Sequence, residues 1–395
     1  MSDGTRGGEL SDLEHLDAKA LEALGARDFA AARRWLTRAV EVDPEDVARW
    51  LKLAAACRAA GDLPAALTAV DRGLAHSPRD FLALLMRANL LERMGQPHAE
   101  AYAIAAGLAP PETALDPATA AALSRGRKIY EDHVERKRAA LQAAGRAANT
   151  GADSFEIDRF IDDHLRLTRR YRQEPSDYYF PGLTDIEFYP RRHFPWIEAF
   201  EAETPAILEE LRGVMDPWLT GFKPYIDYAD HLPIDQFAPL NHNPDWGAFH
   251  LIQNGQRIDA NANRCPRTMA AISRLPQPVV PNRAPAAMFS ALKPRTRIPP
   301  HTGVTNTRLV VHLPLIIPPN CVFRVGNVTR EWTVGEAFSF DDTLEHEAWN
   351  DSDQLRVILI VDVWNPYLTA EQRAAIVSVM GAIDAFDQSG VELGL

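Results

Sequence analysis

The sequence predicts a protein of two parts, a helical region followed by a region built mainly of short antiparallel strands. The chain has 395 residues, which is long for a single hydrophobic core. Its N-terminal part repeats a two-helix pattern about every 34 residues, whereas the part after Leu240 consists of short apolar runs separated by turns. With 46% hydrophobic and 24% charged residues, the composition is that of a folded globular protein.

Three two-helix repeats are predicted over residues 12–111. Pro44 and Pro78 lie 34 residues apart, and a proline pair follows near the next period. Other positions recur in step: Ala39, Gly73 and Gly107, and likewise Arg27, Gly61 and Gly95. Small residues such as Ala39 and Gly73 are expected where helices approach closely. The period and layout resemble tetratricopeptide repeats, whose arrays bind peptides or pack against their own chain.

The rest of the chain is predicted from local patterns. Residues 112–180 read as bridging helices, interrupted at residues 149–153, and one more helix is expected at about residues 196–215. After Leu240 the alternating apolar runs predict strands of an antiparallel sandwich or barrel within a domain spanning residues 181–395. A final helix should begin at Thr369, which forms a capping-box pattern with Gln372.

Charge and cysteine content exclude several classes of partner and site. A net charge of -12 argues against nucleic acid or an anionic membrane surface as a general partner. No apolar run approaches the roughly 20 residues that span a bilayer, and no basic start precedes an apolar core, so a cytoplasmic location is expected. The 3 cysteines are too few and too widely spaced for a disulfide framework or a zinc knuckle. The oligomeric state stays open.

One stretch differs in charge from the rest of this acidic protein. Between Asn261 and Arg330 the sequence contains no Asp or Glu but ten Lys and Arg residues. Such a stretch is either a set of solvated loops or a cleft that attracts anionic small molecules. Charge alone favours the solvated loops, and we expect Arg295 and Arg297 to lie at the surface.

The histidines of the strand region suggest a metal site. Iron(II) oxygenases commonly bind the metal through two histidines and a carboxylate, and His301 and His346 have the separation expected for ligands on two strands of one barrel. A single histidine beside a strand is more often structural. Because side chains alternate along a strand, Arg308 and His312 are expected on one face, as are Asp342 and His346.

A larger pattern strengthens the metal hypothesis. The segments "HTGVTNTRLVVHL", "FRVGNVTREWTVGEAFSFDDTLEHEAWN" and "LRVILIVDVWNP" together resemble the aspartyl/asparaginyl β-hydroxylase family of iron(II)- and 2-oxoglutarate-dependent oxygenases. The resemblance is strongest over residues 289–366, and some members also carry tetratricopeptide repeats. It implies a double-stranded β-helix, a jelly-roll or cupin-like fold, that uses Fe(II), 2-oxoglutarate and O2.

The resemblance also implies roles for individual residues. His301 and His346 match the two iron ligands of the family. Where most of the wider superfamily has a carboxylate two residues after the first histidine, this family has glycine, here Gly303, and water would fill that position. Asp342 is expected either to hold such a water or to cap a turn.

The cosubstrate site is implied in the same way. Arg356 matches the arginine that clamps the distal carboxylate of 2-oxoglutarate, Ser290 the hydroxyl that assists it, and His312 the histidine near the other carboxylate. Human-type members look to have a second arginine where this sequence has Val310. Arg308, on the same strand face, or another group is then expected to supply the charge.

These residues predict an iron(II)- and 2-oxoglutarate-dependent dioxygenase that hydroxylates the β-carbon of an Asp- or Asn-type residue in a peptide or protein held by the repeats. Two alternatives stay open. One is hydroxylation of a free amino acid, another small acid or a lipid-linked acyl chain. The other is a repeat scaffold whose barrel has no catalytic activity.

Overall fold

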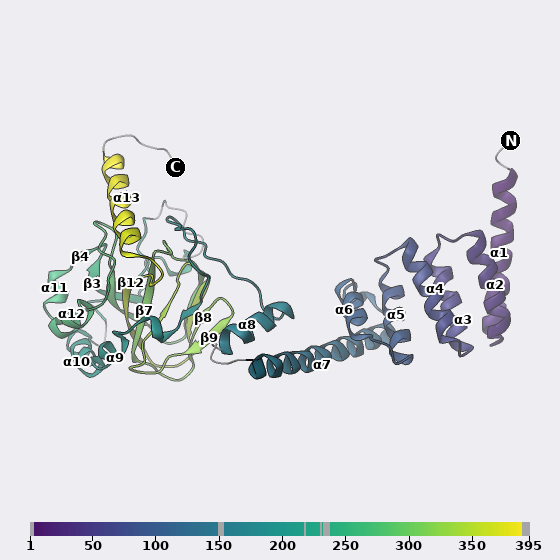
Figure 1. Cartoon of the computed structure of the whole chain (residues 1–395), viewed down its shortest axis with the longest axis horizontal. Helices are drawn as coiled ribbons and strands as arrows, with labels where there is room; N and C mark the ends of the chain where they lie inside the picture. The colour runs from purple at the N-terminus through teal and green to yellow at the C-terminus, as the bar shows by residue number, and fades with distance from the viewer. Residues whose placement is uncertain (1–3, 149–153, 217–218, 230, 232–237, 389–395) are drawn as a thin grey trace. The chain divides into compact units, whose positions relative to one another are not determined.

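The computed structural model describes residues 4–148, 154–216, 219–229, 231 and 238–388, and the chain divides into two compact units, residues 1–167 and 168–395 (Figure 1). The predicted fold class is confirmed: a helical repeat region precedes a domain built from antiparallel sheets. The predicted bridging segment is split by the unit boundary, so its helices belong to the first unit and residues 168–180 to the second. No described helix is long and apolar enough to cross a membrane.

The first unit is a row of helices in which each helix packs on the next along the chain (Figure 1). Three helix pairs come first: α1 (Gly4–Gly25) with α2 (Phe29–Val42), α3 (Val47–Ala59) with α4 (Leu63–His76), and α5 (Phe81–Arg93) with α6 (Ala99–Gly107). The 3-10 turn η1 (Glu112–Ala114) leads to the long helix α7 (Pro117–Ala148), and α8 (Ser154–His164) packs against α7. Helices are thus confirmed on both sides of residues 149–153, which lie outside the described residues.

Aspartates at a 34-residue spacing start the repeat helices. Asp28 and Asp62 accept hydrogen bonds from backbone N–H groups at the beginning of α2 and α4, and Asp46 and Asp80 do the same for α3 and α5. A carboxylate at this position satisfies donors that have no partner inside the helix and favours the positive end of the helix dipole. The starts of these four helices are therefore specified locally.

The other recurring positions have equally local causes. Arg27, Gly61 and Gly95 all have positive φ, at 58°, 84° and 68°, because the chain there reverses between the helices of a pair. A side chain at Gly73 would meet Cβ of Trp50 at 3.1 Å, and Ala39 is completely buried. The expectation that Ala39 and Gly73 lie at helix contacts is confirmed.

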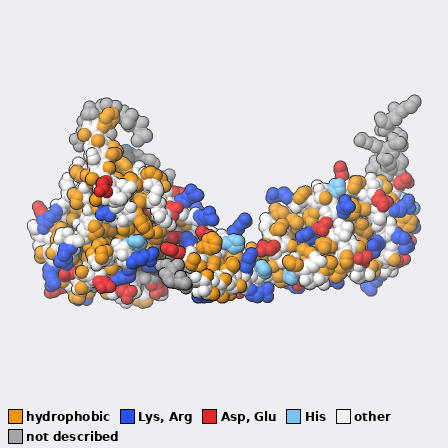
Figure 2. Space-filling model, in the orientation of Figure 1, with side chains coloured by type: hydrophobic (Ala, Val, Ile, Leu, Met, Phe, Trp, Pro, Cys, Tyr) orange, Lys and Arg blue, Asp and Glu red, His pale blue; other side chains and the backbone are white. Residues whose placement is uncertain are grey.

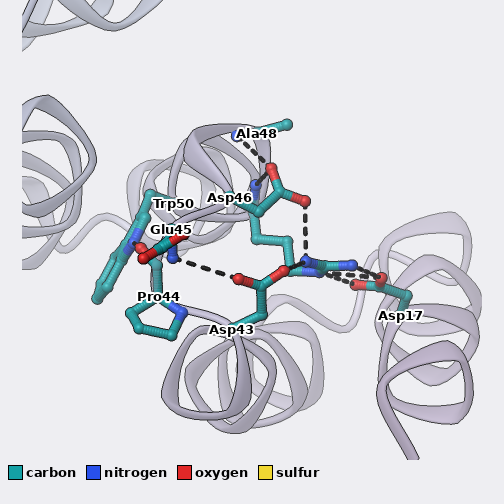
Figure 3. A network of polar contacts seen from close by, with 8 residues as sticks. Asp17, Asp43, Pro44, Glu45, Asp46, Ala48 and Trp50 are labelled. Carbon is teal, nitrogen blue, oxygen red and sulfur yellow. Dashed lines mark hydrogen bonds and ion pairs between the residues drawn. The ribbon is translucent and has the colours of Figure 1, made fainter. Parts of the chain in front are cut away.

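One arginine ties the first repeats together through three carboxylates (Figure 3). The Arg49 guanidinium lies 3.0 Å from Asp17 on α1, 2.6 Å from Asp43 after α2 and 2.9 Å from Asp46 before α3. Its side chain is only 14% exposed, so these pairs are shielded more than ordinary surface pairs. Burial lowers the pKa of Arg49, but the three aspartates outweigh it and raise the pKa above its usual value.

Two antiparallel sheets form the second unit. Among the described residues, the eight-stranded sheet has the order β1-β10-β7-β12-β5-β3-β2, with β4 beside β3, and the four-stranded sheet has the order β6-β11-β8-β9. The bounds in the large sheet are β1 (Phe188–Tyr189), β2 (Lys223–Pro224), β3 (Trp246–Gln253), β4 (Gln256–Arg257), β5 (Ala287–Leu292), β7 (Arg308–Ile316), β10 (Phe338–Phe340) and β12 (Arg356–Trp364). Those in the small sheet are β6 (Thr296–His301), β8 (Cys321–Val325), β9 (Val328–Glu331) and β11 (His346–Asn350). The strands β5 to β12 pass back and forth between the sheets, as in a double-stranded β-helix.

Helices cover the outer face of the large sheet. The side chains on that face form the hydrophobic core, whereas those on the other face point toward the small sheet. The helices of this unit are α9 (Ile197–Glu201), α10 (Thr204–Val214), α11 (Asp259–Ala262), α12 (Pro266–Ile272) and α13 (Ala370–Gln388), with the short turns η2 (Arg191–His193) and η3 (Ala238–Leu240). Along β12, Val357, Leu359 and Val361 join the core under α9, α10 and α12. The intervening residues Ile358 and Ile360 face the small sheet.

Three local expectations can be compared directly with the structure. The helix expected at about residues 196–215 is two helices, α9 and α10, because Pro205 begins a new helix and cannot continue the first. The strand expected to carry Arg308 and His312 is β7, which begins at Arg308, while His301 ends a separate strand, β6. The capping box before α13 is confirmed, since Thr369 and Gln372 exchange hydrogen bonds of 2.9 and 3.2 Å.

The acid-free stretch folds against acids from elsewhere in the chain. Arg295 pairs with Asp353 at 2.7 Å and Arg297 with Asp351 at 3.2 Å, and both arginines are well exposed, as predicted. Figure 2 accordingly shows basic and acidic side chains interspersed on the visible face of the second unit. For these two arginines, the stretch is an ordinary charged surface rather than a cleft.

Candidate active site

A cavity of about 730 Å³ lies between the two sheets of the second unit. Its walls come from both sheets and from the loop that joins β6 to β7. Every residue that the sequence singled out for chemistry lines it: Ser290, His301, Arg308, His312, Asp342, His346 and Arg356. The fold therefore brings together residues spread over 67 positions of the sequence.

His301 and His346 form a cross-strand pair. They are direct partners in the register of β6 and β11, and their ring centroids are 4.0 Å apart. Nδ1 of His301 lies 2.7 Å from the Pro299 carbonyl oxygen, and Nδ1 of His346 lies 3.0 Å from that of Leu344. Because a carbonyl only accepts, each Nδ1 carries the proton, and in the neutral ring Nε2 holds the lone pair.

Both rings are neutral at ordinary pH. Burial, followed by the neighbouring His346, lowers the pKa of His301 to about 3. Burial also lowers the pKa of His346 to about 4, in spite of its bond to the Leu344 carbonyl. Two adjacent neutral imidazoles, each held by a backbone carbonyl at the other nitrogen, are the form in which histidine binds a metal.

Asp342 occupies the space beside the histidines that a side chain at residue 303 would need. A Cβ on Gly303 would lie 2.1 Å from Oδ2 of Asp342, and the Gly303 N–H donates to the Asp342 carbonyl at 2.7 Å. Oδ1 of Asp342 is buried without a hydrogen-bond partner within the described chain. The turn is capped by the preceding residue, because Asp341 accepts hydrogen bonds from both N–H and O–H of Thr343.

Arg308 is held between two carboxylates. Its guanidinium lies 3.0 Å from Asp342 and 3.4 Å from Asp362 on β12. Burial lowers the pKa of Arg308, but Asp342 and Asp362 outweigh it and raise that pKa above its usual value. Sequence reasoning placed Arg308 in the cavity but did not foresee that its charge would be balanced within the protein.

Arg356 has the opposite character. It is the largest fully buried side chain described, and burial lowers its pKa to about 10. The guanidinium lies over the Trp332 ring at 4.9 Å and makes one long contact of 3.5 Å with the Ser290 carbonyl, while Nε has no hydrogen-bond partner. In the described part of the chain no carboxylate pairs with it. A buried cation in this state is a site for an anion.

Two tryptophans that sequence reasoning did not assign to the site orient its polar groups. The Trp246 indole donates to Oγ of Ser290 at 3.2 Å and stacks on Tyr225 with ring centroids 3.9 Å apart. The Trp332 indole donates to Nδ1 of His312 at 3.4 Å, so the neutral His312 ring carries its proton on Nε2. Each of these hydrogen bonds joins a tryptophan to a residue on a different strand. In the sequence, the only signal of such a bond is a tryptophan at or next to the end of a strand.

The residues present fit a metal bound by two imidazoles. No group of three or more His, Cys, Asp or Glu side chains within the described residues could hold a metal by itself. The cross-strand histidine pair and the unpartnered Oδ1 of Asp342 next to it suit an ion that keeps its other coordination positions for small molecules. Arg356, Ser290 and His312 would then face a small anion bound beside that ion.

Both units of the chain are similar to known protein families. Residues 201–366 match the family described as aspartyl/asparaginyl beta-hydroxylase, and residues 23–90 match the tetratricopeptide repeat family. The chain is 37% identical over 155 residues to human aspartyl/asparaginyl beta-hydroxylase, an alignment that covers 39% of this chain and 20% of the human protein. It is 35% identical over 183 residues to the ornithine lipid ester-linked acyl 2-hydroxylase of Rhizobium tropici, covering 45% of this chain and 60% of that protein.

The helical unit has solved structural neighbours as well. One is the Sgt2 TPR domain from Aspergillus fumigatus, with 19% sequence identity and a TM-score of 0.27, covering 36% of this chain and 86% of that one.

Proposed function

We propose that this chain is an iron(II)- and 2-oxoglutarate-dependent dioxygenase acting on an Asp- or Asn-type residue of a peptide or protein. Residues 201–366 match the aspartyl/asparaginyl β-hydroxylase family, and residues 23–90 match the tetratricopeptide repeat family. Two relatives that are named as hydroxylases support a hydroxylase activity for this chain. The chain spans only about a fifth of the human relative and three fifths of the bacterial one, so the substrate is part of the proposal.

The observation that carries the proposal is that the buried Arg356 has no carboxylate partner within the described part of the chain. A guanidinium in this state is costly unless a ligand supplies the negative charge, and a carboxylate can accept two of its N–H groups at once. Ser290 lies on the neighbouring strand β5, where the Trp246 indole occupies a lone pair of its hydroxyl oxygen and leaves the O–H to donate. Together they suit the distal carboxylate of 2-oxoglutarate.

His301, His346 and His312 suit the other end of the cosubstrate. The first two rings present Nε2 lone pairs that would hold iron(II), and the neutral His312 would donate its Nε2–H to the carboxylate next to the metal. Iron(II) with 2-oxoglutarate supplies the activation of dioxygen that an unactivated C–H bond requires. The aromatic and aliphatic lining, including Phe323, keeps bulk water away from this chemistry.

The repeats support a macromolecular substrate. Stacked helix pairs of this kind form extended surfaces that bind peptides and proteins, and here they share a chain with the hydroxylase domain. A substrate held by the repeats would reach the cavity at a raised effective concentration. We therefore assign substrate capture to the first unit and oxidation to the second.

An anaerobic titration tests the proposal. Iron(II) and then 2-oxoglutarate are added to the metal-free full chain, and the visible charge-transfer band of the chelate is recorded. We expect the band in the wild type and in Arg297→Met, which alters an exposed arginine. Arg356→Met, which keeps an unbranched apolar stem in the buried site, should require about 10- to 100-fold more 2-oxoglutarate, the range expected for lost charge-assisted hydrogen bonds.

The possible results separate the alternatives. A band that forms equally well in Arg356→Met removes that residue from the cosubstrate site. A folded wild type that gives no band at all contradicts the oxygenase proposal and favours a repeat scaffold with an inactive barrel. Circular dichroism of each variant distinguishes lost binding from lost folding.

A further inference from the structure

Two arginines line the cavity, Arg356 on β12 and Arg308 on the neighbouring strand β7. Arg356 begins β12, whereas Arg308 pairs in register with Trp364 at the other end of that strand and contacts Asp362. At about 3.3 Å per residue, the backbones of Arg356 and Asp362 are roughly 20 Å apart. Within the described residues Arg356 has no carboxylate partner, whereas Nη1 of Arg308 lies close to two carboxylates. Under the proposed function the cosubstrate takes Arg356, so the substrate meets only the Arg308 end.

Among the described residues that line the cavity, Arg308 is the only Lys or Arg besides Arg356, and its charge is already balanced. One guanidinium faces the carboxylates of Asp342 and Asp362, whose side chains are only 8% and 6% exposed. A third carboxylate brought there would share one cation with two existing anions in a place that water cannot screen. The free energy needed to remove this carboxylate from water would therefore exceed the free energy gained from its attraction to Arg308.

Several apolar side chains line the cavity near this cluster. Val310 lies directly opposite Asp362 in the register of β7 and β12, and Ile360 and Ile226 also line the cavity. A neutral side chain can pack against these residues without displacing an ion pair. The apolar lining and the charge balance of Arg308 thus both favour an uncharged substrate side chain.

We propose, building on the function proposed above, that the substrate group oxidised in this cavity is uncharged and that a carboxylate side chain is rejected. Within the Asp/Asn-type class, the site selects the amide over the acid. The selecting feature is the pairing of Arg308 with Asp342 and Asp362, because no other Lys or Arg among the described lining residues remains for a substrate carboxylate once Arg356 holds the cosubstrate.

The test uses the full chain loaded anaerobically with iron(II) and 2-oxoglutarate. The probes are N-acetyl-aspartate amide, N-acetyl-asparagine amide and N-acetyl-leucine amide, and the readout is the concentration of each that perturbs the visible chelate band. In the wild type we expect the Asn and Leu probes to act at about tenfold lower concentration than the Asp probe, the effect of one uncompensated partly buried charge. Mass spectrometry after admission of air then reports which probe gains oxygen.

Variants test the cause of the selectivity. Asp362→Asn removes one of the two carboxylates around Arg308 while keeping an oxygen for the Ala286 N–H. The ratio of the effective concentration of the Asp probe to that of the Asn probe should then fall at least severalfold. Asp351→Asn makes the same chemical change at the surface, where Asp351 pairs with the exposed Arg297, and should leave the ratio unchanged. If Asp362→Asn does not fold, Val310→Arg adds a cation beside Asp362 from β7 and should narrow the ratio in the same way.

The outcomes are separable from those of the proposed function. No chelate band in the folded wild type removes the proposed function and this inference with it. A band that responds to the Asp probe as readily as to the Asn probe overturns the inference alone. A band that none of the three probes perturbs, in the wild type or in either cavity variant, also overturns it, because side-chain charge would not be what the cavity selects.

Discussion

The carboxylate of Asp342 and the missing side chain of Gly303 are two halves of one steric relationship. A methyl group on Gly303 would lie 2.1 Å from Oδ2 of Asp342, well inside any tolerated contact. Asp342 cannot swing away easily, because the same oxygen lies 3.0 Å from Arg308. The glycine is therefore required by packing, apart from any requirement of the metal site.

Gly303→Ala should lower the stability of the second unit by about 1–3 kcal/mol, the usual cost of inserting a methyl group into a filled site. Chemical denaturation measures this loss. In an Asp342→Ala background the steric part should disappear, so the two changes should be clearly non-additive. Additive losses would mean that the contact between residues 303 and 342 is not what excludes a side chain.

Trp246→Phe should weaken 2-oxoglutarate binding without unfolding the protein. Phenylalanine keeps an aromatic face for Tyr225 but cannot donate to Ser290, whose hydroxyl then loses its fixed orientation. One lost hydrogen bond of about 1 kcal/mol corresponds to a rise of roughly fivefold in the 2-oxoglutarate concentration needed to form the chelate. Trp349→Phe, on β11 outside the cavity lining, is the control and should bind the cosubstrate like the wild type.

Arg49→Ala should destabilise the helical unit by about 2 kcal/mol, because three carboxylates lose their shared partner and repel one another. The matched control is Arg87→Ala, which breaks a single exposed pair with Asp71 and should cost less than about 1 kcal/mol. Thermal unfolding of both variants gives the comparison. Equal losses would show that the three-carboxylate cluster adds nothing beyond a surface pair.

Asp341 should make the second unit less stable as the pH rises. Burial raises the pKa of this carboxyl from 3.8 to about 7, although its hydrogen bonds from Thr343 act in the opposite direction. Between these values the folded protein holds a proton that the unfolded chain has released, so folding takes up a proton and stability falls from about pH 4 to pH 7.

Thermal unfolding across this range measures the effect. Relative to the wild type, Asp341→Asn should therefore gain stability progressively between pH 4 and pH 7. For Asp353→Asn, which alters an exposed carboxyl, the curve of stability against pH should run parallel to that of the wild type. A parallel curve for Asp341→Asn as well would contradict the raised pKa.

The helical repeats and the cavity residues could be predicted because their causes are local or carried by motifs. The spacing of Arg27, Gly61 and Gly95 reflects the positive φ that each turn between paired helices needs. His301, His346 and Arg356 could be named because they lie in segments that resemble one family, and the fold indeed brings them to one cavity.

The partners of those residues could not be predicted, because each partnership joins segments that meet only in the folded chain. Arg308 on β7 is balanced by Asp342, which follows β10, and by Asp362 on β12. The sequence shows the arginine but not how much of its charge remains available. The change of sheet at residues 302–307, between β6 in the small sheet and β7 in the large one, is hidden for a related reason, because strand periodicity does not show which sheet a strand joins.

The alternation of core and cavity side chains along β12 limits which mutations can alter the specificity of the cavity. Val357, Leu359 and Val361 hold the sheet to its helices, while Arg356, Ile358 and Ile360 between them shape the cavity. Substitution at every second position can therefore alter what the cavity accepts and leave the core intact. An insertion or deletion of one residue would exchange the two sets at a single step. The strand tolerates new specificity through replacement but not through a change of length.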